Sequence, residues 1–134
     1  MTPAETGSRL RGSCLCGAVR FEVDGELKAP DACHCHACRK TTGHYLVSTD
    51  VPRDRLTVHG AEQVSWYQSS EKIRRGFCSR CGSTLFWDPT HRDWTSIAMG
   101  AFAAPTGTHI EMHIFVDEKG DYYELNDGLP QHRQ

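Results

Sequence analysis

The chain has 134 residues, of which 38% are hydrophobic and 24% are charged, and its formal net charge is −2. This length fits one domain, and the slight negative charge argues against a protein that mainly binds nucleic acid or an anionic membrane. The longest apolar run, 97–104, is interrupted by Gly100 and falls well short of the roughly 18 residues of a membrane-spanning helix. Residues 1–13 contain no apolar signal core, so we expect a soluble cytoplasmic protein without membrane or nucleic-acid partners.

Alternating β-branched and aromatic residues predict strands along most of the chain. The clearest strand, 18–23, ends at the turn pair Asp24-Gly25. Further strands are expected at 45–48, 56–58, 63–67, 73–77, 84–87, 94–99 and 113–116, with a weak last one at 122–125. Only residues 37–42, before Gly43, suggest a helical turn. The pattern predicts one all-β, or mostly β, domain.

Seven cysteines in so short a chain form the most informative pattern in the sequence. A closed disulfide framework would leave one thiol over, and we expect no export to an oxidising compartment. The short spacings favour metal binding instead, and they group the thiols as Cys14 with Cys16, Cys33 with Cys35 and Cys38, and Cys78 with Cys81. Seven thiols then divide into four plus three.

The central run can supply three ligands from one tight turn, whereas neither outer pair can complete a metal site alone. We therefore predict that the outer pairs share one structural zinc, bound by Cys14, Cys16, Cys78 and Cys81. A catalytic zinc, with a fourth position open for water or substrate, is predicted at Cys33, Cys35 and Cys38. Two Zn²⁺ ions are thus expected per chain, and iron is the alternative metal.

Glycines follow both outer pairs: Gly17 comes after Cys16 and Gly82 after Cys81. In metal-binding knuckles the backbone turns so that its N–H groups point at sulfur, and this turn often needs a positive φ, which glycine adopts at little cost. We expect such a turn after each pair.

The sequence resembles the glutathione-dependent formaldehyde-activating enzyme family, which also contains centromere protein V. The resemblance rests on GSCLCGAV at 12–19, CHCHACRK at 33–40 followed by Gly43, and FCSRCGS at 77–83. The endings HIF at 113–115 and DGLP at 127–130 are also similar. The resemblance therefore implies a single zinc-binding domain over 10–130, and we expect a disordered or loosely held segment at 1–9. One departure is the stretch GAFAAP at 100–105, which lacks the acidic residues of many relatives.

This resemblance implies a β-tent fold and the same two ligand sets. It also implies a zinc-dependent carbon–sulfur lyase similar to S-(hydroxymethyl)glutathione synthase, which adds glutathione to formaldehyde or a related small aldehyde. In that reading the open zinc site binds the substrate thiol, which then attacks the aldehyde carbon. The sequence does not predict the oligomeric state.

Several charged side chains are candidates for the remaining roles. His36 and His44 are the nearest titratable groups to the central run and could protonate the new alkoxide. Glutathione has two carboxylates, so cations near the cysteines are candidate substrate ligands. The candidates are Arg39, Lys40, Arg74 and Arg75, with Lys72 and Arg80 nearby. Alternation points His34 away from the metal, and a solvated charged face is the plainer explanation for each cation.

A competing interpretation is a non-catalytic zinc-binding module that contacts protein or nucleic acid. The C-x-x-C pair and the basic stretch around Arg74 favour it, whereas the acidic residues toward the C-terminus oppose it. A fourth protein ligand such as His36 could then close the second zinc site.

Overall fold

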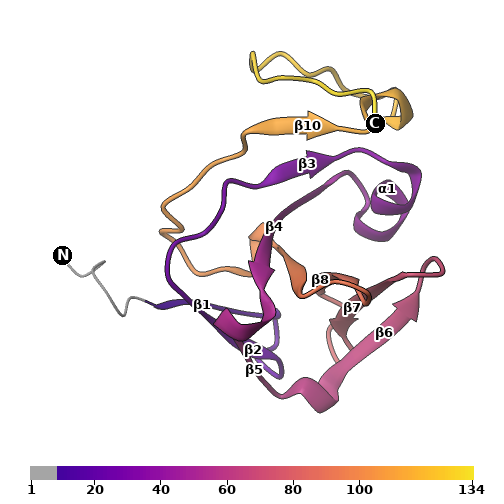
Figure 1. The fold of residues 1–134 in the computed structure, drawn as a ribbon. Coiled ribbons are helices and arrows are strands. Elements are labelled where there is room, and N and C mark those ends of the chain that lie inside the picture. Colours follow the sequence, from indigo (N-terminus) through magenta and orange to yellow (C-terminus); the bar gives the residue numbers. More distant parts are fainter. Residues whose placement is uncertain (1–8) are drawn as a thin grey trace.

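The structure is a computed structural model, and it describes residues 9–134. It is mostly β, with two sheets and one short helix (Figure 1). The small sheet has the order β1-β2-β5, with bounds Arg9–Ser13, Arg20–Asp24 and Leu56–His59. The large sheet has the order β10-β3-β4-β9-β8-β7-β6, with bounds Met112–Ile114, Asp31–Cys33, Leu46–Pro52, Trp94–Ala98, Thr84–Pro89, Ile73–Cys78 and Val64–Gln68.

Helix α1 spans His36–Thr42, and four 3₁₀ turns connect other elements. These turns are η1 (Arg53–Arg55), η2 (Ala61–Gln63), η3 (Met99–Ala101) and η4 (Val116–Glu118). The helix lies where the sequence predicts it, and Gly43 ends it at a φ of 90°. In the described part of the chain, no helix is long and apolar enough to cross a membrane.

The core lies where the small sheet packs against the large one. Phe21 and Val23 of β2 are buried because alternate residues of that strand point inward. The ring of Phe21 meets those of Phe86 and Phe102 edge-on, at centroid distances of 6.2 and 5.1 Å. Gly12 lies opposite Phe21 in the register, and a Cβ atom there would come within 2.3 Å of the Phe21 ring.

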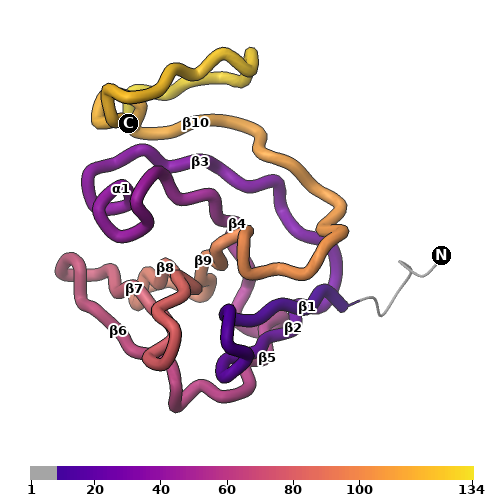
Figure 2. Tube along the Cα trace, turned by 180° about the vertical axis from the view of Figure 1, so that it is seen from behind, coloured from indigo at the N-terminus to yellow at the C-terminus, as the bar shows by residue number. Residues whose placement is uncertain are grey.

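The predicted strands are confirmed in position, with shifts of a few residues at their ends, except for the last. The segment expected at 122–125 is a loop, because residues 130–132 instead lie along β10. Figure 2 shows the yellow end of the chain alongside that strand. The strand expected at 113–116 stops at Ile114, since Phe115 takes a left-handed φ of 55°.

Two strands were not predicted. Asp31–Cys33 is only three residues long, which is too short to show an alternating pattern. Arg9–Ser13 is mainly polar, and its pairing with β2 is strengthened by the ion pair of Arg9 with Glu22 at 2.8 Å. Of the segment predicted to be loosely held, residues 1–8 lie outside the described residues, and Arg9 already belongs to β1.

Candidate metal centres and the adjoining pocket

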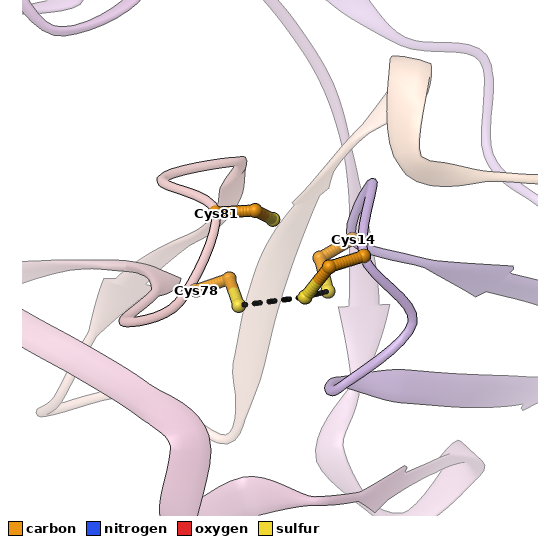
Figure 3. A group of neighbouring side chains, drawn as sticks. Cys14, Cys78 and Cys81 are labelled. Carbon is orange, nitrogen blue, oxygen red and sulfur yellow. Dashed lines mark hydrogen bonds between the residues drawn. The ribbon is translucent and has the colours of Figure 1, made fainter.

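The four outer cysteines meet at the contact between two turns, one joining β1 to β2 and the other β7 to β8. Their sulfur atoms all lie within 4.8 Å of one another. Figure 3 shows Cys14 on one side and Cys78 and Cys81 on the other, with their sulfurs directed into a shared space. The Sγ atoms are 3.7 Å apart for Cys14 and Cys16 and 3.8 Å apart for Cys16 and Cys78.

These separations suit a tetrahedral metal ion. A tetrahedron with metal–sulfur bonds of about 2.3 Å has edges of about 3.8 Å. The pKa of Cys81 is lowered to about 5, mainly because the Ser83 hydroxyl and then the Ser83 backbone stabilise its thiolate. Four thiols at this spacing, one already favoured as thiolate, fit Zn²⁺ as a ligand set.

The backbone around this cluster has the expected knuckle geometry. Gly17 and Gly82 have φ values of 82° and 80°, in the left-handed region that favours glycine. The N–H of Val19 donates to Cys14 Sγ at 3.3 Å, and the N–H of Arg80 donates to Cys78 Sγ at 3.4 Å. Both N–H groups therefore stabilise negative charge on sulfur.

The three central cysteines form a second cluster between β3 and α1, again with all sulfurs within 4.8 Å of one another. Cys35 caps the helix, because its Sγ accepts from the Cys38 N–H at 3.3 Å. Hydrogen bonds from Cys33 and Cys38 lower the pKa of Cys35, and the nearby guanidinium of Arg75 lowers it further. Arg75 also donates to Cys38 Sγ at 3.5 Å.

The described residues supply three metal-ligating side chains at this second cluster and no fourth. In particular, His36 does not join the cluster; its side chain is exposed, while its backbone N–H donates to Glu118. In residues 9–134, His36 therefore does not close the second site, as the competing interpretation of a non-catalytic module would require. A metal bound here would keep one position for an outside ligand.

The three-cysteine cluster opens into a cavity of about 360 Å³. One face of the large sheet lines it, because alternate side chains of four strands point the same way. Apolar walls come from Leu46, Ile73, Trp87, Trp94 and Ile114, and polar groups from Asp31, Asp50, Ser48, Ser69, Ser70, Ser96 and Arg75. Hydrophobic walls with a few polar groups are typical of a small-molecule site.

Of the candidate cations, the structure brings Arg75 alone into the lining of this cavity. Arg74 points to the opposite face of β7, where it binds the buried carboxylate of Asp88 at 2.7 Å and covers the Trp66 ring. Arg39 and Lys40 lie on α1 outside the lining, with Lys40 exposed.

The two candidate proton donors are also outside the cavity lining. His44 is exposed, and its Nδ1 is 2.9 Å from the hydroxyl of Tyr122. His36 begins α1 and is exposed as well. Neither side chain is therefore positioned to touch a ligand in the cavity directly.

A buried chain of polar groups behind the cluster was missed by sequence reasoning. His34 does not join the cysteine cluster; it is buried, and its Nδ1 is hydrogen-bonded to the hydroxyl of Tyr123. Its Nε2 is 2.9 Å from Nδ1 of His113, whose Nε2 is 2.8 Å from Asp127 Oδ2. Because the carboxylate of Asp127 can only accept, His113 donates to Asp127, His34 donates to His113, and the Tyr123 hydroxyl donates to His34. This chain joins the C-terminal segment to the loop that holds Cys33 and Cys35.

The chain is similar to known proteins in sequence and in fold. A family profile described as glutathione-dependent formaldehyde-activating enzyme matches residues 9–118. The chain is 36% identical over 130 residues to a Halomonas elongata protein provisionally named a glutathione-dependent formaldehyde-activating enzyme, covering 87% of this chain and 80% of the relative. It is 27% identical over 115 residues to a Schizosaccharomyces pombe protein named an uncharacterized lyase, covering 85% of this chain and 83% of that one.

Among solved structures, a crystal structure of a Rhodobacter sphaeroides protein has a similar fold. The TM-score is 0.61 at 22% identity, covering 75% of this chain and 98% of the other. The fold, the cysteine spacing and the extent of the family match lead to one conclusion: this chain belongs to the glutathione-dependent formaldehyde-activating enzyme family.

Proposed function

We propose that the protein is a zinc-dependent carbon–sulfur lyase of the S-(hydroxymethyl)glutathione synthase type, acting on glutathione and formaldehyde or a related small aldehyde. The observation that carries this proposal is the three-sulfur cluster, which lacks a fourth protein ligand in the described residues and opens into a cavity. The family match and the names of the relatives support the same chemistry.

In this proposal each cluster binds one Zn²⁺. Cys14, Cys16, Cys78 and Cys81 hold a structural ion, and Cys33, Cys35 and Cys38 hold a catalytic one. A zinc ion at the open site would promote deprotonation of an incoming thiol and polarise a carbonyl oxygen.

The residues of the chain position the reactants. The thiolate sulfur attacks the aldehyde carbon, a C–S bond forms, and the carbonyl π electrons move to oxygen, which takes up one proton. Arg75, beside Cys38, is the cation best placed to bind a substrate carboxylate, with the hydroxyls of Ser69 and Ser70 on the same wall. Because His36 and His44 lie outside the lining, the proton reaches the alkoxide from water in the open cavity.

The test is the rate at which zinc-loaded protein converts ¹³C-formaldehyde and glutathione to the hemithioacetal, followed by exchange NMR above the uncatalysed rate. Wild type is expected to accelerate the exchange, whereas Cys35→Ser, with its structural zinc intact, is expected to lose the acceleration. Equal rates for the two proteins, or for wild type stripped of its second metal, would contradict the proposal.

A non-catalytic interaction module remains the second candidate, and one observation favours it. Leu15 is 90% exposed at the tip of the first knuckle, and Tyr67 is 61% exposed on β6. Exposed apolar side chains of this kind can mark a contact surface. Catalysis that depends on Cys35 would leave this candidate no role at the second cluster.

The seven cysteines are all unpaired, which supports a reducing compartment such as the cytoplasm.

A further inference from the structure

The cavity beside the three-cysteine cluster has positive and negative side chains on different walls. Arg75 lies on β7 near Cys38, whereas Asp31 and Asp50 lie on β3 and β4. The hydroxyls of Ser48 and Ser96 accompany the two carboxylates. A ligand that fills this cavity therefore meets a cation on one wall and two acids on another.

Strand register sets the distance between the sulfurs and the acids. Cys33 pairs with Leu46, and Asp31 pairs with Ser48, one step further along β4. Asp50, another step along, pairs with Ser96 of β9. At about 3.3 Å per residue, the acidic side chains lie roughly 7 to 13 Å along the sheet from the row that contains Cys33.

The two acids are not fully neutralised by the protein. Asp31 Oδ1 is buried and has no hydrogen-bond partner, which is costly for a carboxylate oxygen. Asp50 accepts from the Ser96 hydroxyl at 2.5 Å and, more weakly, from the exposed Lys28 ammonium at 3.4 Å. The negative charge of the nearby Glu111 carboxylate acts on Asp31 as well. A cationic hydrogen-bond donor is the group this side of the cavity is missing.

We infer that Asp31 and Asp50 bind the ammonium group of the thiol substrate while its sulfur lies at the three cysteines. This inference rests on the proposed function and adds a requirement to it. In glutathione the ammonium is separated from sulfur by about 10 Å of extended chain, which falls within the span of the acidic wall. A thiol of the same length without the amine brings no cation to these two carboxylates.

The test compares glutathione with glutaryl-cysteinyl-glycine, which has the same skeleton but no amine. Binding of each thiol to zinc-loaded protein is measured by calorimetry. We expect wild type to bind glutathione at least about tenfold more tightly, because a hydrogen-bonded charge pair contributes that much or more. Asp31→Asn and Asp50→Asn should weaken glutathione binding by a similar factor and leave the affinity for the amine-free thiol unchanged. Asp54→Asn, an exposed position outside the cavity, is the matched control.

The outcomes separate the inference from the function on which it rests. Equal affinities of wild type for the two thiols, or equal losses for both thiols in Asp31→Asn and Asp50→Asn, would overturn the inference while leaving thiol binding established. Binding of neither thiol to wild type would overturn the proposed function itself. Zinc content and thermal unfolding of each variant show whether the fold is retained, and Asp50→Asn alone decides the question if Asp31→Asn does not fold.

Discussion

The four sulfurs of the first cluster come from two turns, with Cys16 and Cys78 separated by 62 residues, whereas those of the second come from one short run between β3 and α1. A metal at the first cluster would therefore close a long loop and tie the small sheet to the large one. A metal at the second would close almost no loop, and its position faces a cavity. The separation of the ligands along the chain and their number are therefore the two features that differ between a structural metal site and a candidate catalytic one.

The largest expected effect is on folding, from loss of a ligand in the first cluster. Cys78→Ser should lower the free energy of unfolding by more than about 4 kcal/mol, because structural zinc binding is coupled to folding. Chemical denaturation followed by circular dichroism measures this change. Cys35→Ser, in the second cluster, is the matched control and should retain most of the stability. Equal losses in the two variants would remove the distinction between the clusters.

The second prediction concerns metal content and activity. Cys35→Ser should reduce bound zinc from two ions to one per chain and lower the catalysed rate at least about 100-fold, since two thiolates no longer make a site of this type. Metal analysis by mass spectrometry and the exchange assay measure these quantities. Retention of both ions with normal activity would show that Cys35 is not a ligand.

The third prediction tests whether the second cluster depends on the buried polar chain behind it. His113→Leu should lower the free energy of unfolding by about 1–3 kcal/mol, because it leaves His34 Nε2 and Asp127 Oδ2 without the imidazole that each now contacts. It should also weaken zinc binding at the second cluster, through His34, more than at the first. Chelator competition with a chromophoric indicator resolves the two affinities. Equal weakening at both clusters would mean that the chain supports the fold generally.

The fourth prediction gives a loss of stability that is independent of both clusters. Asp88 is 2% exposed and binds Arg53 and Arg74 at 2.7 Å each. Although burial opposes the charge, these two guanidinium groups hold the pKa of Asp88 below its usual value of 3.8. Its contribution is therefore complete above pH 3.8 and is lost as the pH falls through the folded-state value.

Asp88→Asn should accordingly be about 1–3 kcal/mol less stable than wild type at pH 7. The difference between the two proteins should shrink as the solution is acidified below pH 4, as measured by urea unfolding. A difference that stays constant to pH 2 would show that the carboxylate charge does not contribute.

The smallest effect is expected at the exposed histidines. His44→Gln should change the catalysed rate by less than about threefold, because His44 does not line the cavity. The exchange assay at pH 6 and pH 8 measures this. A loss of more than tenfold that follows the ionisation of one group would make His44 the proton donor.

Local patterns in the sequence predicted much of the fold and the groups of cysteines that come together. The alternation in β2 and the Gly43 helix end need only a few neighbouring residues, and short cysteine spacings constrain where sulfurs can meet. Strand β3 was not predicted because three residues are too few to show an alternating pattern. The strand predicted at 122–125 was wrong because residues 130–132, not 122–125, pair with the edge of the sheet.

The features that required the structure are the long-range ones. Asp31 and Asp50 share a cavity wall only because β3 and β4 pair in one register. The contact of His34 with His113 depends on the parallel pairing of β3 and β10, across 79 residues of chain. Periodicity shows which way a side chain points, but not which distant side chain it meets.

We propose that protein sulfur saturates one metal ion and leaves one position open on the other. Zinc K-edge X-ray absorption on the two-zinc protein tests it by counting sulfur neighbours with and without glutathione. We expect about 3.5 sulfurs per zinc in the free protein, the mean of four and three, with oxygen or nitrogen completing the second ion. Addition of glutathione should raise the count to about four. A count of four in the free protein, or a value unchanged by glutathione, would contradict the claim.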